Sequence, residues 1–236
     1  CDTDVTRKDL AQWFFKITEY AGELLSDIDD KLQGWPDRVT TMQKEWIGRS
    51  YGAEIDFTIE ETGEKLPIFT TRPDTIYGVT FMAISPESEL IDRLNLEGEY
   101  AERVNEYQQK ALLRSDIERA AANEEKDGVF TGKYAINPFN GEKIQLWVAD
   151  YVLAGYGTGA VMAVPAHDTR DFAFAHKYGI PIKVVIHPDE NTTLDPAQME
   201  DAFTEYGPMA NSDLFNGLKG QDAVQKVTEH AQSQGF

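Results

Sequence analysis

Strand-like patterning is the feature of this sequence that most limits the folds open to it. Residues 53–59 alternate apolar and polar side chains, which is typical of a strand with one buried face. Further apolar runs predict strands at 66–71, 79–84, 145–149, 160–164 and 181–186. These strands outnumber those of a regular alternation of strand and helix. The sequence therefore predicts a mixed α/β fold, with a barrel-like mixed β-sheet core surrounded by helices.

Helical periodicity accounts for much of the remaining chain. Apolar residues at spacings of three and four predict a helix over 8–32, ended by a glycine and a proline. Residues 39–50 are expected to form a connector, and the main body begins near residue 50. Further helices are predicted at 86–95, 99–125, 168–178 and 220–233. The chain is therefore expected to consist of a connecting arm at 1–49 and one large domain at 50–236.

Composition excludes several classes of protein. The formal net charge is −19, from 22 basic and 41 acidic residues, and this argues against a protein that tracks a long nucleic-acid backbone. The single cysteine cannot form a disulfide within the chain, which fits a reducing compartment. No apolar run has membrane-spanning length and no signal peptide is evident. We therefore expect a cytoplasmic protein, and the absence of an initial methionine favours a fragment of a longer chain.

The first polar cluster is Thr70-Thr71-Arg72-Pro73-Asp74-Thr75, at the end of a predicted strand. Threonine hydroxyls can contact sugar hydroxyls or an attacking water, and their methyl groups set the size of a pocket. Ordinary strand propensity followed by a proline-aspartate turn explains the same residues without any function. The residues by themselves leave both interpretations open.

The second polar cluster follows another predicted strand and ends in Ala166-His167-Asp168-Thr169-Arg170-Asp171. Asp168 stands at the expected N-cap of a helix and Asp171 three residues later, so helix capping explains both carboxylates. A helix N-terminus beside a strand end would also hold a carboxylate rigidly enough to pair with a substrate ammonium group. Helix capping and substrate binding both remain possible.

His167 has three possible roles. It could act as a general base, or it could bind a metal together with Asp168 and Asp171. The other histidines do not stand four residues from His167, which is the spacing of a helical ligand pair. A hydrogen-bonded histidine at a helix entry is the commoner case, so no metal site is expected.

The two clusters together resemble the editing insertion of class I aminoacyl-tRNA synthetases. The form Arg72-Pro73-Asp74-Thr75 resembles the leucyl branch. Gly157 to Asp168 and Arg170 to Phe172 resemble the second long motif of the insertion. Trp46 to Ser50 resembles the strand linker that leads into it. The resemblance covers essentially the whole chain. It implies an editing domain at 50–236, with a helix and a strand linker at 1–49 that connect it to the synthetase body.

The resemblance also implies an activity and partners. The expected reaction is hydrolysis of the ester in mischarged aminoacyl-tRNA-Leu that carries isoleucine, norvaline or methionine type side chains, with correctly charged leucyl-tRNA excluded. The expected partners are the 3' terminal adenosine of aminoacylated tRNA-Leu and the remainder of the synthetase, and no membrane. Neither signature of the synthetic site occurs in the sequence. ATP would thus be used by the full-length synthetase, and this domain is expected to need no cofactor.

The resemblance implies catalytic roles for four residues. Asp171 would bind the α-ammonium of the substrate. Thr70 and Thr71 would orient the ribose or the water. Thr75 would act as a steric gate against the γ-branch of leucine.

Substrate-binding roles are expected for Thr75 and for a further set of seven residues. Met162 and Val164 would line the side-chain pocket, and Tyr156 would stack on the adenine. Arg72 and Arg170 would steer a phosphate or brace Asp171, and His167 and Asp168 complete the set. Two alternatives stay open: a metal-dependent hydrolase that uses His167, Asp168 and Asp171, or a non-catalytic module that binds the tRNA end.

Overall fold

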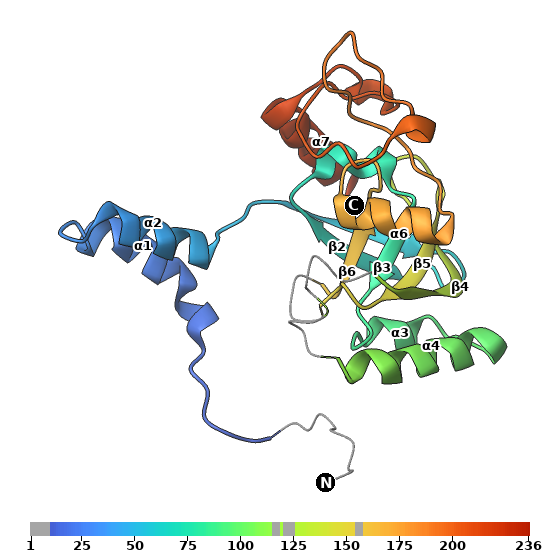
Figure 1. Ribbon diagram of the computed structural model, residues 1–236, viewed down its shortest axis with the longest axis horizontal. Coiled ribbons are helices and arrows are strands. Elements are labelled where there is room, and N and C mark those ends of the chain that lie inside the picture. Colours follow the sequence, from blue (N-terminus) through green and yellow to red (C-terminus); the bar gives the residue numbers. More distant parts are fainter. Residues whose placement is uncertain (1–9, 115–118, 120–125, 154–157) are drawn as a thin grey trace. The chain divides into compact units, whose positions relative to one another are not determined.

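The computed structural model describes residues 10–114, 119, 126–153 and 158–236. The chain divides into two compact units, Cys1–Tyr51 and Gly52–Phe236 (Figure 1). No helix in these described stretches is long and apolar enough to cross a membrane.

The first unit is built from helices. A 3-10 turn, η1 (Ile17–Tyr20), leads into α1 (Ala21–Lys31), and α2 (Asp37–Ile47) packs against α1. The Lys44 amino group lies 2.5 Å from the Asp29 carboxylate across the two helices. Gly48, with φ +59°, ends α2 in the left-handed conformation that glycine adopts without steric cost.

Two predictions for this unit were wrong. The helix expected over 8–32 begins only at residue 17, and the expected connector at 39–50 is largely α2. Trp46 and Ile47 therefore end a helix and do not form the strand linker that the resemblance suggested. Ile28 is the one buried residue among the described residues of this unit. Because amphipathic helices gain most of their stability from packing, an apolar stripe without a core is a poor guide to helix length.

The second unit is formed around a six-stranded mixed sheet in the order β2-β1-β4-β5-β3-β6. The strands are β1 (Ala53–Ile59), β2 (Lys65–Thr70), β3 (Phe81–Ile84), β4 (Gly128–Ile136), β5 (Lys143–Ala149) and β6 (Ala160–Ala163). Strands β3 and β5 pair in parallel, and the other pairs are antiparallel. The predicted alternation in β1 is confirmed, since Ile55, Phe57 and Ile59 are buried.

The sheet curls so that its two edge strands approach each other. β2 and β6 stand at opposite ends of the strand order, yet they are in contact. No ladder is recorded between them, so the sheet is barrel-like without being closed by hydrogen bonds among the described residues. This confirms the predicted mixed, barrel-like core, and it brings the ends of β2 and β6 together.

The central strands are buried on both faces of the sheet. In β3, Met82 and Ile84 belong to one hydrophobic cluster, whereas Phe81 and Ala83 belong to a second cluster. Successive side chains of a strand point to opposite faces, so this division means that each face needs its own cover. Helix α6 (Thr169–Tyr178) covers the second cluster with Phe174 and lies across the sheet in Figure 1. Helices α4 (Gly98–Leu112) and α7 (Gly220–Gln234) contribute to the first cluster.

Strand β4 was not predicted, for a local reason. Gly132, with φ +75°, interrupts the strand pattern, and the register with β5 shifts between Phe130 and Tyr134. A side chain at position 132 would meet the ring of Tyr100, at 2.8 Å from an added Cβ atom. A bulge with glycine in a left-handed conformation breaks the two-residue period by which strands are identified.

Several predicted elements differ in extent. The helix expected at 86–95 is reduced to α3 (Leu90–Arg93), and that expected at 99–125 is α4, whose predicted continuation lies mostly outside the described residues. The strand expected at 181–186 forms only an isolated bridge from Ile186 to Met209. Short 3-10 helices occur at η2 (Pro73–Gly78), η3 (Pro196–Gln198) and η4 (Asp213–Phe215).

The aromatic contact under α6 should contribute strongly to stability. Phe81 is fully buried and stacks on Phe174, with ring centroids 5.0 Å apart. We expect Phe81→Ala to lower the free energy of unfolding by about 3–5 kcal/mol, because it leaves a cavity between strand and helix. Leu214→Ala, at a side chain that is 68% exposed, is the control and should change it by less than about 0.5 kcal/mol. If urea unfolding showed the same loss of stability in both variants, this result would contradict a core buried on both faces of the sheet.

Candidate functional site

The two polar clusters of the sequence meet at one cavity of about 510 Å³. It lies where β2 runs into η2 and where β6 runs into α6, the two places that the curled sheet brings together. The lining includes Thr70, Thr71, Arg72, Thr75, Met162, Val164, His167, Asp168, Arg170 and Asp171. Tyr156 lies outside the described residues. Ten of the eleven predicted site residues thus line a single cavity, although their roles remain predictions.

Asp171 is a buried carboxylate in the wall of this cavity, with 6% of its surface exposed. One carboxylate oxygen accepts a hydrogen bond from the Tyr151 hydroxyl at 3.1 Å, and the other accepts from the Val164 N–H at 2.9 Å. Burial raises the pKa of Asp171 to about 7, and the nearby charge of Asp168 adds to this rise. A cation beside this carboxylate would favour its charged form, so the position suits an ammonium ligand.

Helix capping explains Asp168 but not Asp171. The Asp168 side chain accepts from the Arg170 N–H at 2.9 Å and from the Asp171 N–H at 3.2 Å, which is an ordinary N-cap. In a capping box the carboxylate of residue 171 would bond back to the Asp168 N–H. That N–H instead donates to the Val164 carbonyl. The Asp171 carboxylate therefore lies in the cavity wall, bonded to Tyr151 and Val164, and does not cap the helix.

The threonines of the first cluster are held by their own turn. The Thr75 hydroxyl donates to the Arg72 carbonyl at 2.9 Å, and only 2% of the residue is exposed. The Thr70 hydroxyl accepts from the Arg72 N–H at 3.0 Å, whereas Thr71 is exposed. A β-branched residue with a committed hydroxyl has one χ1 rotamer, so Thr75 presents a fixed shape to the cavity.

Arg72 is engaged in a local ion pair. Its guanidinium contacts both carboxylate oxygens of Asp74, with the shortest bonds at 3.0 Å, and it also donates to the Thr204 carbonyl. The ring of Tyr206 lies 4.3 Å from the guanidinium carbon. Arg72 therefore braces Asp74 and the 204–206 segment, and the structure records no bond between it and Asp171 among the described contacts.

Arg170 is likewise paired with its neighbour on the helix. Its guanidinium lies 3.2 Å from the Asp168 carboxylate, and its side chain is largely exposed at the cavity. A phosphate that approached Arg170 would compete with Asp168. The predicted phosphate-steering role would therefore require the arginine to exchange partners.

His167 has both ring nitrogens bonded to the main chain. One nitrogen, Nδ1, lies 2.9 Å from the Phe203 carbonyl, and Nε2 accepts from the N–H groups of Val185 and Ile186 at 3.1 Å each. Burial lowers the pKa of His167 to about 4, so the ring is neutral at pH 7. These bonds also limit the strand predicted at 181–186, because the N–H groups of Val185 and Ile186 bond to the histidine and not to a neighbouring strand. A role as general base or metal ligand would require breaking this arrangement.

The apolar side of the cavity comes from β6 and the segment that follows it. Met162 is partly buried and packs on the first hydrophobic cluster, and Val164 is a buried member of that cluster. Both line the cavity as predicted.

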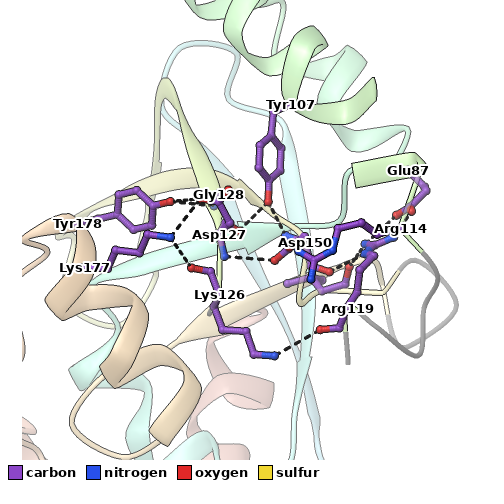
Figure 2. A network of polar contacts seen from close by, with 11 residues as sticks. Glu87, Tyr107, Arg114, Arg119, Lys126, Asp127, Gly128, Asp150, Lys177 and Tyr178 are labelled. Carbon is purple, nitrogen blue, oxygen red and sulfur yellow. Dashed lines mark hydrogen bonds and ion pairs between the residues drawn. The ribbon is translucent and has the colours of Figure 1, made fainter. Parts of the chain in front are cut away.

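Sequence reasoning missed a third wall. Arg119, Lys126, Tyr151, Val152 and Leu153 also line the cavity. Figure 2 shows Arg119 and Lys126 within a network of polar contacts that includes Glu87 and Asp150. Tyr151 and Val152 follow the end of β5, and a strand end is a signal that could have identified them. Arg119 falls within the charged segment predicted as a helix at 99–125, where no sequence pattern marked it as a cavity residue.

Comparison with known proteins identifies the kind of domain that carries this cavity. The family model described as the editing domain of leucyl-tRNA synthetase matches residues 44–232. A leucine--tRNA ligase of Symbiobacterium thermophilum is 53% identical over 240 residues, covering 100% of this chain and 28% of the relative. That of Thermotoga maritima is 52% identical over 236 residues, again with 100% and 28% coverage. The chain thus spans about a quarter of the length of these relatives.

A solved structure agrees with the sequence relatives. The Agrobacterium radiobacter LeuRS in a ternary complex with tRNA and LeuAMS is 40% identical, with a TM-score of 0.63, over 80% of this chain and 23% of that one. The class is that of aminoacyl-tRNA synthetase editing domains, which confirms the predicted resemblance. Within that class, the chain belongs to the family of leucyl-tRNA synthetase editing domains.

Stability should depend on pH through His167 over a defined window. Its pKa is about 4 in the folded chain and 6.5 in the unfolded one, so the unfolded chain binds more protons between these values. Stability from this group is complete above pH 6.5 and is lost as the pH falls toward 4. Asp171 acts in the opposite direction, because its folded pKa of about 7 lies above its unfolded value. The free energy of unfolding of the wild type, measured against pH, would therefore not separate the contribution of His167 from that of Asp171.

The variant His167→Gln isolates the histidine contribution. We expect the difference in free energy of unfolding between wild type and this variant to shrink by about 3 kcal/mol from pH 7 to pH 4. His176→Gln, at an exposed position on α6, is the control and should show no such convergence. A difference that stays constant over the window would mean that His167 is not held neutral.

Proposed function

We propose that residues 50–236 hydrolyse the ester bond of mischarged aminoacyl-tRNA-Leu. Water is added across the ester, which releases the wrong amino acid and leaves the tRNA with a free terminal hydroxyl. Amino acids with isoleucine, norvaline or methionine type side chains would be removed, and correctly charged leucyl-tRNA would be spared. The observation that carries this proposal is the buried Asp171 carboxylate in a cavity wall shared with Thr70, Thr71 and Thr75.

A second site is useful for physical reasons. A hydrophobic pocket separates side chains that differ by one methylene by only about 1–3 kcal/mol. Leucine and isoleucine have equal volume and no polar group, so shape is the remaining basis for discrimination. A cavity that rejects the γ-branch of leucine would provide the missing selectivity.

Asp171 would bind the α-ammonium, which every aminoacyl ester carries. Its two oxygens already hold the Tyr151 hydroxyl and the Val164 N–H, so the carboxylate is fixed before substrate arrives. Fixed polar groups lose little freedom when they bind, and this favours accurate placement of the ester. Thr70 and Thr71 would orient the ribose or the attacking water.

No side chain of the cavity stands out as a general base. His167 is the residue type best suited to that task, yet both its nitrogens are used by the main chain. We propose that the cavity acts by positioning, with the free ribose hydroxyl assisting the water, and that it uses no metal or cofactor. The reaction would then depend on how precisely the ester is held.

The acidic composition fits a limited contact with tRNA. Arg72, Arg119 and Arg170 each have a carboxylate partner within the domain, so they add little net positive charge at the cavity. The 3' terminal adenosine would enter as a single strand, which stacking and a few local contacts can hold. The remainder of a cytoplasmic synthetase would bind the body of the tRNA.

The charge of Asp171 should be essential for editing. Asp171→Asn keeps the size of the side chain but removes the charge that pairs with the ammonium. Losing one partner of such a pair costs about 2–5 kcal/mol, so we expect kcat/KM for isoleucyl-tRNA-Leu to fall by about 30- to 4000-fold. The measurement is deacylation by the chain within a full-length leucine--tRNA ligase, with the melting temperature recorded on the same sample.

Asp222→Ala, at an exposed aspartate on α7, is the matched control and should edit at the wild-type rate. Full activity of Asp171→Asn would overturn the role of the carboxylate. Binding of mischarged tRNA without turnover by the wild type would favour a non-catalytic module. Loss of wild-type turnover with a chelator would favour a metal-dependent hydrolase.

Thr75 should determine which amino acid is rejected. Thr75→Ala removes the fixed methyl group and leaves room for the γ-branch of leucine. We expect the variant to hydrolyse leucyl-tRNA at a rate approaching that for isoleucyl-tRNA. Thr75→Phe should fill the cavity and stop hydrolysis of both.

The same two substrates test the gate against a control. Thr58→Ala, at an exposed threonine of β1, should leave discrimination unchanged. If Thr75→Ala spares leucyl-tRNA as well as the wild type does, the gate lies elsewhere in the wall, at Met162 or Val164.

A further inference from the structure

Arg119 is the largest fully buried side chain in the described part of the chain. A charged residue is almost never fully buried unless it is paired, so its partners indicate its purpose. The guanidinium forms an ion pair with Glu87. It also donates to the Asp150 carbonyl at 2.7 Å and to the Val152 carbonyl at 2.9 Å.

Those two carbonyls stand on either side of Tyr151. The hydroxyl of Tyr151 in turn donates to the Asp171 carboxylate at 3.1 Å. A continuous series of bonds therefore runs from Glu87 through Arg119 and the main chain of 150–152 to Asp171. Glu87, Arg119 and Asp150 appear together in Figure 2.

Asp150 is held independently from its other side. Its N–H donates to the Tyr107 hydroxyl at 3.0 Å, and that hydroxyl donates to the Asp127 carbonyl at 2.7 Å. Arg114 lies 2.7 Å from the Asp150 carboxylate. With Asp150 anchored in this way, Arg119 links residue 152 to the anchor through its side chain, in addition to the bond from the Val152 N–H to the Ala149 carbonyl.

We propose that Arg119 and Tyr151 are positioning residues of the editing site, and that Arg119 holds the main chain around Tyr151 so that its hydroxyl keeps the Asp171 carboxylate in place for the substrate ammonium. This inference rests on the proposed function of Asp171. It assigns a role to two residues that neither polar motif contains.

The groups around Asp171 define the expected effect. Asp168 and Arg170 face it from its own helix, Tyr151 from the segment after β5, and the Val164 N–H from the end of β6. Arg72, Arg119 and Lys126 are further charged groups in the same cavity. Hydrogen bonds to the charged form of a carboxylate favour ionisation, so loss of the Tyr151 hydroxyl should raise the pKa of Asp171.

The test is the pH profile of kcat/KM for deacylation of isoleucyl-tRNA-Leu by the chain within a full-length leucine--tRNA ligase. The variants are Tyr151→Phe, Arg119→Lys and the double variant. We expect the acid limb to move to higher pH by about half a unit or more in Tyr151→Phe, which is about a threefold loss on that limb. Arg119→Lys should move it in the same direction.

The double variant tests whether the two residues act through one another. If Arg119 acts through the Tyr151 hydroxyl, the double variant should show no larger displacement than Tyr151→Phe alone. Glu87→Gln removes the charge that pairs with the Arg119 guanidinium, and it should move the acid limb by a smaller amount. This variant decides the role of Arg119 if Arg119→Lys fails to fold. Arg93→Lys and Tyr100→Phe, at more exposed sites, are the matched controls and should keep the wild-type profile.

The outcomes separate this inference from the proposed function. A purely structural role predicts a lower melting temperature with an unchanged acid limb, and this result would overturn the inference. If Asp171→Asn abolishes editing while Tyr151→Phe keeps the wild-type profile, the inference alone fails. If the wild type edits and Asp171→Asn edits equally well, the proposed role of Asp171 fails, and the inference fails with it.

Discussion

Burial of the central strands on both faces is the constraint on which the rest of the second unit depends. Strands β3 and β5 divide their side chains between two hydrophobic clusters, so neither face can be left to solvent. Helix α6 covers one of these faces through Phe174, which packs on Phe81. Because α6 must lie there, its N-terminus stands beside the end of β6. The position of Asp171 in the cavity wall is thus a consequence of how the core is covered.

The cavity is built from polar groups that are already bonded to the protein. Asp171 holds a hydroxyl and an N–H, His167 holds three main-chain groups, and Arg119 holds two carbonyls. Buried polar groups destabilise a fold unless they find such partners, and once bonded they move little. The hydrogen bonds that offset the cost of burying these polar groups therefore also hold them in a fixed geometry. This agrees with a site that works by placing an ester accurately.

The pairing of charges reconciles an acidic domain with the proposed tRNA substrate. Every arginine that lines the cavity has a carboxylate partner, and the chain as a whole carries a charge of −19. Such a surface offers little general attraction for a phosphate backbone. Recognition would then depend on the ammonium group and the shape of the side chain, which are the features that distinguish one aminoacyl ester from another.

The sequence by itself determined the local elements whose signals are complete within a few residues. The alternation in β1 and the Asp168 N-cap of α6 are local patterns, and both are confirmed. The two polar motifs are also local patterns, and they line one cavity, although the roles of their residues remain predictions. The mixed barrel-like fold followed from the number of strands, and the membership of the family followed from the motifs. The extent of the helix before residue 32 was misjudged, because an apolar stripe predicts a helix only where there is a core to receive it.

Tertiary structure alone decided which polar groups meet. The bulge at Gly132 concealed β4, and His167 accepts the N–H groups of Val185 and Ile186 within the strand predicted at 181–186. Arg119 and Tyr151 are linked to Asp171 through bonds between residues 31 and 20 positions apart. The capping pattern could not distinguish Asp168, which caps the helix, from Asp171, which lines the cavity. That distinction depends on where the chain folds back, because a hydrogen-bond partner distant in sequence leaves no periodic signal in it.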